Sequence, residues 1–251
     1  MAAIDPGTLQ AVILAAGRGT RMRPVSDRIP KPLIPINGRP FLGHLLDIVA
    51  DTGIAAASTV VVVRYLKDQV KDFLTAYAPS VRSTEQPRLD GTAGALFCAM
   101  SHLDPARPVL MLMGDNFYSR RDVAAMCGAG THAIGCIRSG APERYGVVET
   151  GGTPPRVTRI VEKPVHYFFE RYVLISTGLH LFLPSFHHVL HEEVAVHRRR
   201  EMDGEIPLTD AVNRLAAAET VAPVELDDWR DMGCPEDIPA MAEWVLQRAD
   251  K

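Results

Sequence analysis

The sequence predicts an α/β protein whose mixed, mostly parallel sheet carries helices on both faces. In the first half, short apolar runs rich in β-branched residues alternate with segments of helical periodicity. That alternation is typical of a parallel sheet in which each helix connects one strand to the next. After about residue 131 the pattern changes to closely spaced strands separated by turns, which indicates added antiparallel pairs. The sequence has neither an internal repeat nor a long linker, so we expect residues 1–251 to form one domain.

The first half is predicted to alternate strands with helices along the chain. Its first strand covers residues 11–15, because this run is apolar, short and ended by Gly17. The strand over residues 58–64 is β-branched through its centre, which favours burial on both faces. The other predicted elements are helices over residues 40–49, 67–77 and 94–103, an extended segment over residues 81–85 and a strand over residues 108–113.

The second half is predicted to add strands and then to close with helices. Strand patterns cover residues 132–138, 145–150, 156–162 and 172–183, and helical patterns cover residues 184–196 and 207–218. The last helix is expected to begin at Pro235, because proline is favoured at the first helical position and Glu236 and Asp237 suit the first turn. Its expected buried stripe consists of Ile238, Met241, Ala242, Val245 and Leu246.

The composition argues against several classes of function. The chain has 27 basic and 30 acidic residues and a net charge of -3, so no surface for nucleic acid is expected. Its longest apolar runs, residues 58–63 and 109–113, are too short to cross a bilayer, and residues 1–10 lack the pattern of a signal peptide. The four cysteines are scattered, which favours reduced thiols. We therefore expect a cytoplasmic enzyme with no membrane partner.

Residues 10–39 form the most informative segment of the chain. After the first strand, Gly17 and Gly19 leave the backbone open to a ligand, and Thr20 adds a hydroxyl. Five cations and four prolines share this segment, and stiff cationic loops suit a polyphosphate: Arg18, Arg21, Arg23, Arg28 and Lys31, with Pro24, Pro30, Pro32 and Pro35. The segment is not a P-loop, because Arg21 follows Gly19-Thr20 where Gly-Lys-Ser/Thr is needed. It is not a dinucleotide fingerprint either, since Met22 replaces the third glycine.

Leu14-Ala-Ala-Gly-Arg-Gly-Thr-Arg21 followed by Pro30-Lys31-Pro32 resembles the signature of the sugar-1-phosphate nucleotidylyltransferases, and is similar to that of the glucose-1-phosphate thymidylyl- and uridylyltransferases. The resemblance implies a Rossmann-like nucleotidyltransferase fold with a nucleotide-binding half over about residues 10–130 and a smaller sugar-phosphate-binding half over about residues 131–251. It implies transfer of a nucleotidyl group from a nucleoside triphosphate to a sugar-1-phosphate, giving an NDP-sugar and pyrophosphate. The residues that it assigns to the nucleotide are Leu14, Ala16, Gly17, Gly19 and Thr20, and those that it assigns to the phosphates are Arg21 and Lys31.

Two aspartates are the candidate ligands of a catalytic Mg²⁺. Asp115 follows the strand over residues 108–113, at the strand end where open α/β sheets bind ligands; a turn or helix cap is the alternative for Asp115-Asn116. In the family, the acidic residue at this place holds magnesium. The second ligand implied by the resemblance is Asp231, because residues 229–237 resemble Trp-x-Asp-x-Gly-Thr-Pro-Glu-Asp. Cys234 departs from that pattern and is expected to be a packing variant, whereas Asp227 and Asp228 are expected to be solvated.

The segment from Gln86 to Leu96 is the candidate site for the nucleobase. A glutamine amide can pair with a donor and an acceptor on a base edge, and Gly91 would let the backbone approach the ring. The resemblance assigns base contacts to Gln86, Gly91 and Thr92. It is divided between two classes, since Gln-Pro-x-x-Asp-Gly looks like the enzymes that use dTTP or UTP, and Gly-Thr-Ala-Gly-Ala-Leu looks like the guanylyl enzymes.

The sugar phosphate is expected to lie against residues of the second half. Tyr145-Gly146-Val-Val and Glu162-Lys163-Pro match the family closely, and Thr177 stands in a weaker match. The resemblance gives Tyr145, Gly146, Glu162 and Thr177 to the sugar and Lys163 to the phosphate between sugar and nucleotide. An exposed ion pair at a strand end is the plain alternative for Glu162-Lys163.

The sequence leaves several readings open. The favoured reaction uses dTTP or UTP with a hexose-1-phosphate; the alternatives are a cytidylyl- or guanylyltransferase acting on a heptose, cyclitol or choline phosphate, and a non-catalytic nucleotide-sugar sensor. His187 and His191 are expected to be ordinary helix residues and not zinc ligands. Residues 198–200 are read as a solvated charge run or a contact in a homo-oligomer. Because the chain stops soon after residue 237, we expect it to lack the left-handed β-helix domain that longer relatives append.

Overall fold

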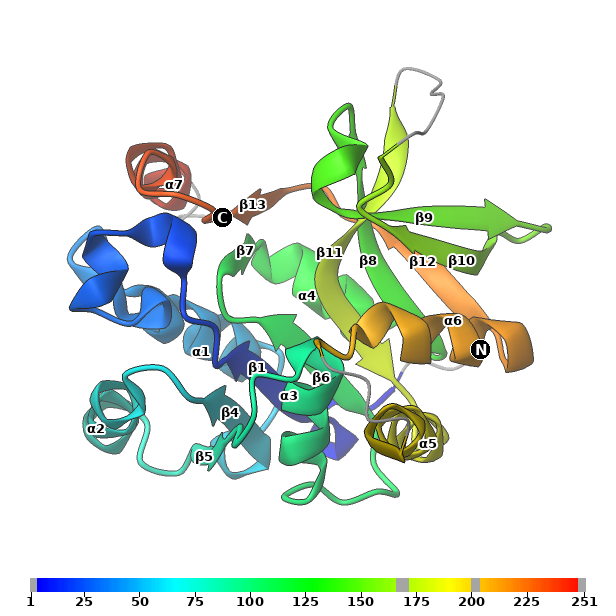
Figure 1. Ribbon diagram of the computed structural model, residues 1–251, viewed down its shortest axis with the longest axis horizontal. Helices are drawn as coiled ribbons and strands as arrows, with labels where there is room; N and C mark the ends of the chain where they lie inside the picture. The colour runs from blue at the N-terminus through cyan, green and yellow to red at the C-terminus, as the bar shows by residue number, and fades with distance from the viewer. Residues whose placement is uncertain (1–3, 166–171, 200–203, 248–251) are drawn as a thin grey trace.

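The computed structural model describes residues 4–165, 172–199 and 204–247. Within them, one nine-stranded sheet runs through both halves of the chain, with the strand order β10-β9-β11-β6-β1-β4-β5 and with β8 between β11 and β12 (Figure 1). The sheet is therefore mixed, and α-helices cover both of its faces. The α/β class that the sequence predicts is confirmed.

The first half supplies the parallel part of the sheet. Its strands are β1 (Gln10–Ala15), β4 (Thr59–Val63), β5 (Arg82–Glu85) and β6 (Val109–Met113), and its helices are α1 (Phe41–Asp51), α2 (Lys67–Tyr77), α3 (Gly91–Met100) and α4 (Arg120–Cys127). β1 lies in the middle and pairs in parallel with β4 on one side and β6 on the other. The carboxyl ends of these central strands therefore meet at one edge of the sheet.

The second half supplies most of the antiparallel part. Its strands are β8 (His132–Ser139), β9 (Gly146–Gly151), β10 (Arg156–Glu162), β11 (Val173–Phe182) and β12 (Val221–Glu225), and its helices are α5 (Phe186–Arg199), α6 (Leu208–Ala218) and α7 (Asp237–Leu246). β11 connects the two halves, because it pairs antiparallel with β6 of the first half and with β8 and β9 of the second.

Two hydrophobic clusters lie on opposite faces of the sheet. Successive side chains of a strand point to opposite faces, and Ile13 of β1 belongs to one cluster while Val12 and Leu14 belong to the other. The cluster around Ile13 includes buried residues of α1, α2, α4 and α7. The cluster around Val12 includes buried residues of α3, α5 and α6. This alternation explains why an almost fully apolar β1 is buried over its whole length.

The last helix returns to the N-terminal part of the chain. In Figure 1, α7 (red) lies beside the blue segment that follows β1. A hydrogen bond from Asn37 Nδ2 to the Ala242 carbonyl, 2.8 Å long, joins the two segments. α7 begins at Asp237, two residues after the expected start at Pro235, and Trp244 is buried in it while Leu246 is 63% exposed. The expected inclusion of Leu246 in the buried stripe is therefore wrong.

The sequence patterns also differ from the structure around residues 91–131. α3 begins at Gly91, three residues before the expected start. No element is predicted between residues 117 and 131, where the structure has α4 and most of β7 (Asn116–Tyr118). The start of α4 has a local cause, because Ser119 Oγ accepts a hydrogen bond from Asp122 N at 3.0 Å and caps the helix. β7 has a long-range cause, since its partner is β13 (Trp229–Asp231).

Candidate functional site

The pairing of β7 with β13 brings two distant aspartates together. In this antiparallel pair Asp231 lies opposite Asn116, the residue after Asp115. The Met232 backbone N–H continues the pairing and donates to the Asp115 carbonyl at 3.1 Å. Burial raises the pKa of the Asp231 carboxyl, and the negative charge of Asp115 raises it further. The two carboxylates therefore influence each other electrostatically.

Lys31 neutralises part of this negative charge. Its Nζ lies 2.6 Å from Asp115 Oδ2, and its side chain is only 9% exposed. The Lys31 stem passes over Gly19, where an added Cβ would lie 3.2 Å from Lys31 Cβ and where φ is +62°. The Gly19 carbonyl accepts a hydrogen bond from Ser26 Oγ at 2.8 Å, which fixes the loop in this shape. The glycine-rich loop therefore makes room for the lysine as well as for a ligand.

Gly114 fixes the position of Asp115 relative to the same loop. Its backbone N–H donates to the Leu14 carbonyl at 2.9 Å. A Cβ at residue 114 would lie 2.6 Å from Leu14 O, which is closer than real side chains come to a backbone oxygen. The end of β6 thus fits against the end of β1 only without a side chain, and Asp115 follows directly.

A cavity of about 240 Å³ opens beside these groups. Most of the sequence-predicted phosphate, metal and sugar residues line it, together with one predicted base contact, Thr92: Arg21, Asp115, Tyr145, Gly146, Glu162, Lys163, Thr177 and Asp231. Residues that the sequence reasoning did not assign to the site also line it: Met111, Met113, Asn116, Arg144, Ile160, Ser176, Gly178, His180, Leu208, Thr209 and Trp229. Arg144 and Trp229 had a signal in the sequence, because Arg144 adjoins Tyr145 and Trp229 begins the motif that contains Asp231, whereas His180 had none.

Tyr145, Glu162 and Lys163 meet at one wall of the cavity. The Tyr145 hydroxyl is 3.4 Å from Asp231 Oδ2, and burial, followed by the charge of Asp231, raises the pKa of Tyr145. Lys163 takes a left-handed backbone with φ +41°, and its N–H donates to the Tyr145 carbonyl at 3.0 Å. Its Nζ is 3.7 Å from Glu162 Oε1. Gly146 is required beneath them, because a Cβ there would lie 2.9 Å from Ile160 Cγ2.

The remaining predicted nucleotide residues lie outside this cavity. Leu14 and Ala16 are buried at the end of β1 and just beyond it, and Gly17 has no atom of the described residues within 4 Å of an added Cβ. Gln86 is 3% exposed, and its Nε2 donates to Asp90 Oδ1 at 2.9 Å and to the Gly91 carbonyl at 3.0 Å. The amide nitrogen of Gln86 is therefore already used by its own loop.

Gly91 contacts the segment before α6, and Thr92 contacts the first residue of that helix. Gly91 has φ +81°, and a Cβ there would lie 2.6 Å from Ile206 O. Thr92 Oγ1 accepts a hydrogen bond from the Leu208 N–H at 3.0 Å. Ile206 therefore fills the Cβ direction of Gly91, so a base ring could approach the Gly91 backbone only from another side.

Thr177 and Arg198 both have hydrogen-bonding or charged partners within the chain. Thr177 is 1% exposed, and its hydroxyl donates to the Gly135 carbonyl at 2.8 Å, so the hydroxyl is committed to the sheet. Arg198 is 41% exposed, in line with the expectation of a solvated residue, and its Nη2 lies 3.3 Å from Asp90 Oδ2 while its guanidinium lies over the Phe97 ring. Residue 200 of the same charge run lies outside the described residues.

The aspartates and the cysteine near Asp231 have structural partners. Asp228 was expected to be solvated, but its side chain is 13% exposed and lies 3.6 Å from Arg230. Asp227 is 61% exposed, as expected, and pairs with Arg121. The N–H of Cys234 donates to Asp237 Oδ2 at 2.8 Å, and its thiol lies 3.4 Å from the same oxygen. The thiol therefore takes part in local packing at the start of α7.

Residues 10–248 match the family model described as nucleotidyl transferase. The chain belongs to the nucleotidyl transferase family. It is 30% identical over 246 residues to the UTP–glucose-1-phosphate uridylyltransferase AglF of Haloferax volcanii. The aligned region covers 91% of this chain and 93% of AglF. It is 29% identical over 241 residues to the bifunctional protein GlmU of Methanocaldococcus jannaschii. That aligned region covers 96% of this chain but 55% of GlmU. The chain thus spans about half the length of the GlmU relatives that it matches.

Solved structures share this fold of the nucleotidyl transferase family. A UDP-glucose pyrophosphorylase in complex with UDP-glucose has a TM-score of 0.79 and 17% sequence identity, and covers 95% of this chain and 98% of that one. The UDP-glucose pyrophosphorylase from Acinetobacter baumanii has a TM-score of 0.77 and 21% identity, with 96% and 94% covered. These likenesses establish the fold of the chain.

Asp115 and Asp231 are the two carboxylates of the site that could hold a metal ion. Within the described residues, no group of three or more histidine, cysteine, aspartate or glutamate side chains could hold a metal ion. Mg²⁺ commonly binds to one or two carboxylates and completes its shell with phosphate oxygens and water. Asp115 and Asp231 could provide such a pair, because their mutual repulsion would be relieved by a divalent cation.

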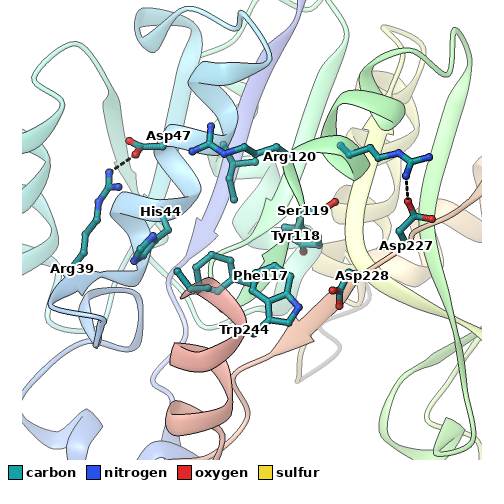
Figure 2. Close-up of a pocket in the computed structure, with 13 residues that line it drawn as sticks. Arg39, His44, Asp47, Phe117, Tyr118, Ser119, Arg120, Asp227, Asp228 and Trp244 are labelled. Atoms are coloured by element: carbon teal, nitrogen blue, oxygen red, sulfur yellow. Dashed lines mark ion pairs between the residues drawn. The ribbon is translucent and has the colours of Figure 1, made fainter. Parts of the chain in front are cut away.

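A second, larger cavity of about 620 Å³ lies among α1, α4, α7, β7 and the two residues before β13. Figure 2 shows Phe117 and Trp244 at its base, with arginines around them. Its cations already have acidic partners, since Arg39 pairs with Asp47, Arg120 with Asp51, and Arg121 with Asp227. The family motifs contribute no predicted contact residue to this cavity.

Among the described residues, no helix has the length and apolar character needed to cross a membrane.

Proposed function

We propose that this member of the nucleotidyl transferase family transfers a nucleotidyl group from a nucleoside triphosphate to a sugar-1-phosphate, giving an NDP-sugar and pyrophosphate. The observation that carries the proposal is the meeting of Asp115, Asp231 and Lys31 beside a cavity that Glu162 and Lys163 line on another side. Carboxylates for a metal, cations for phosphates and hydrogen-bonding groups for a sugar are the three needs of this reaction. The relationship to AglF supports UTP with glucose-1-phosphate as the substrates, and the Gln86 motif keeps dTTP and other hexose-1-phosphates in the proposal.

The reaction needs no general base from the protein. An oxygen of the sugar-1-phosphate attacks the α-phosphorus, the bond from that phosphorus to the bridging oxygen breaks, and pyrophosphate leaves with the electron pair. The second pKa of a phosphate monoester is about 6, so the nucleophile is already an anion at neutral pH. The barrier therefore comes mainly from repulsion between polyanions, and catalysis consists of positioning and charge neutralisation.

The proposed roles follow the charges of the site. Arg21 would hold the departing phosphates, Lys31 would hold the phosphates from the loop side while it orients Asp115, and Lys163 would contact the α-phosphate. Mg²⁺ bound by Asp115 and Asp231 would supply charge neutralisation at the phosphates. Nucleotide contacts are proposed at Leu14, Ala16, Gly17, Gly19, Thr20, Gln86, Gly91 and Thr92, and sugar contacts at Tyr145, Gly146, Glu162 and Thr177.

The geometry modifies two of these roles. Gln86 would present its amide oxygen to the base, because its nitrogen holds Asp90 and Gly91. Thr177 would act through its backbone, since its hydroxyl is bonded to Gly135. The nucleotide-binding half is accordingly proposed for about residues 10–130 and the sugar-phosphate-binding half for about residues 131–251.

Pyrophosphate release tests the proposal directly. The purified chain is incubated with Mg²⁺, each of five triphosphates (ATP, GTP, CTP, UTP and dTTP) and a panel of hexose, heptose, cyclitol and choline phosphates, and products are identified by mass spectrometry. We expect an NDP-hexose with UTP or dTTP. A product with CTP or GTP alone would move the assignment to the alternative acceptors. Absence of pyrophosphate release from every pair would overturn the proposal and leave a nucleotide-sugar sensor.

A further inference from the structure

Residues 86–90, here called the base loop, lie between two cavities that the glycine-rich loop also borders. Thr92, just after the base loop, lines the cavity of the paired aspartates, as does Arg21 of the glycine-rich loop. Pro87 and Leu89 of the base loop line a further cavity of about 450 Å³ together with Arg18. A ligand that follows the glycine-rich loop therefore passes along the base loop.

The backbone of Gln86 is held at the end of β4. Its N–H donates to the Val63 carbonyl at 3.0 Å, and its own carbonyl accepts from Arg64 Nη1 at 2.7 Å. Both protons of the side-chain amide are used, since Nε2 donates to Asp90 Oδ1 and to the Gly91 carbonyl. No described residue donates to Gln86 Oε1, which still contacts solvent, so this oxygen is the polar atom left for a ligand.

Asp90 determines which end of the Gln86 amide faces outward. The two ends of an amide have nearly the same size, so hydrogen bonds select between them and packing does not. A flipped amide would set its oxygen against the Asp90 carboxylate and the Gly91 carbonyl with no proton between them, which is costly. The carboxylate therefore fixes Gln86 as an acceptor toward the ligand.

Two segments of the second half hold Asp90 in place. Arg198, in the last turn of α5, has its Nη2 3.3 Å from Asp90 Oδ2, and its guanidinium carbon lies 5.1 Å from the centre of the Phe97 ring. The Asp90 carbonyl accepts a hydrogen bond from the Ile206 N–H at 2.8 Å. The carboxylate also needs Gly94, because an added Cβ there would overlap Asp90 Oδ1. The side chain of Asp90 is only 14% exposed, so these contacts set its position.

We propose that Arg198 is a positioning residue for base recognition, which acts through Asp90 to keep the Gln86 amide oxygen facing the base. This inference rests on the proposed function and extends it to base specificity. An acceptor oxygen suits the N3–H of uracil and thymine, whereas N3 of cytosine carries a lone pair and would face the oxygen without a proton. A site built to hydrogen-bond one base discriminates against a base that leaves the bond unmade. The site should therefore favour UTP and dTTP over CTP.

Four variants and a control test this role. Asp90→Asn keeps the shape of the side chain but adds a donor that lets Gln86 flip, and Gly94→Ala displaces the same carboxylate by contact. Arg198→Ala removes the ion pair, whereas Arg198→Lys keeps the charge. Arg199→Ala is the matched control, because Arg199 is the next residue of α5, is exposed and has no ion pair with the described residues. Dissociation constants of UTP and CTP with Mg²⁺ are measured by calorimetry, and kcat/KM is measured for each triphosphate.

For Asp90→Asn we expect the preference for UTP over CTP to fall about ten- to hundredfold, and Gly94→Ala should follow it. Arg198→Ala should lower the preference about two- to fivefold, because the ion pair is partly exposed. Arg198→Lys should recover most of that loss, and Arg199→Ala should equal the wild type. The KM of the sugar-1-phosphate should not change in any variant.

A merely structural role would weaken both triphosphates by the same factor, so an unchanged preference in Asp90→Asn or Arg198→Ala would overturn the inference. Equal binding of UTP and CTP to the wild type would also overturn it. If no triphosphate yields pyrophosphate but the binding preference still narrows in Arg198→Ala and recovers in Arg198→Lys, the proposed reaction fails and the positioning role stands. If pyrophosphate is released and every variant keeps the wild-type preference, the reaction stands and the positioning role fails.

Discussion

The Lys31 ammonium lies 2.6 Å from the Asp115 carboxylate, although the two residues come from a proline-rich turn and from the end of β6. The pair is nearly closed to solvent on the lysine side, where only 9% of the side chain is exposed. Asp231 faces the same place through the β7–β13 pair. One cation and two carboxylates thus share a small volume at the end of β6.

Asp115→Asn should reduce turnover at least about a hundredfold while the protein stays folded, because it removes a metal-binding charge and the partner of Lys31. Arg21→Ala should have a comparable effect, since Arg21 lines the cavity beside the carboxylates. Initial rates of pyrophosphate release and circular dichroism of purified variants provide the measurement. Asp227→Asn is the matched control, because that carboxylate is 61% exposed and lies at the other cavity. Near-normal rates for Asp115→Asn would refute its role.

Gly17→Ala should bind the triphosphate poorly without loss of stability. An added Cβ at residue 17 has no atom of the described residues within 4 Å, so only a ligand would meet it. Displacement of the phosphates by a methyl group should lower kcat/KM about ten- to hundredfold. Steady-state kinetics against triphosphate concentration, together with the melting temperature, check this expectation. An unchanged KM would place the nucleotide away from Gly17.

Gly114→Ala should destabilise the fold itself. The new Cβ would lie 2.6 Å from Leu14 O, and neither backbone can move without disturbing the β1–β6 pairing. Overpacking of this kind costs about 1–3 kcal/mol, which urea denaturation can resolve. Gly128→Ala serves as the comparison, because its Cβ would meet only atoms at 3.6 Å and 3.7 Å. Equal unfolding free energies for the two variants would contradict the close approach.

The buried imidazole of His180 should make the protein sensitive to acid. Its folded-state pKa is lowered to about 4, below the unfolded value of 6.5, so the unfolded state binds more protons between these pH values. Stability is therefore lost as pH falls below 6.5, and the loss levels off below about 4. Relative to His180→Phe, the wild type should lose about 2–3 kcal/mol between pH 7 and pH 4.5. Urea denaturation at both pH values measures the difference, and parallel losses in the two proteins would show that His180 is not the source.

Local patterns determined much of the fold. Apolar runs that are fully buried in β1 and β4 were predicted within one residue of their ends, because β-branched runs and terminating glycines are short-range signals. The helix over residues 67–77 was predicted at its observed bounds, because Val70, Phe73 and Leu74 have helical spacing and Pro79 follows the helix. The Gly17–Arg21 loop, the carboxylate after β6 and the motif around Asp231 could be selected from residue type and order, and family membership bears out the resemblance that they carry.

Only the tertiary structure decided how these groups meet. The pairing of β7 with β13, which joins Asp115 to Asp231, depends on strands more than a hundred residues apart, and neither strand is long enough to have a period of its own. The orientation of the Thr177 hydroxyl toward Gly135 and the contact of Gly91 with Ile206 are likewise set by neighbours from distant segments. His180 carries no motif, and its place in the cavity follows from its register with β6. Sequence supplies residue types and local periodicity, whereas contacts between distant segments depend on strand register and packing that no short window of sequence contains.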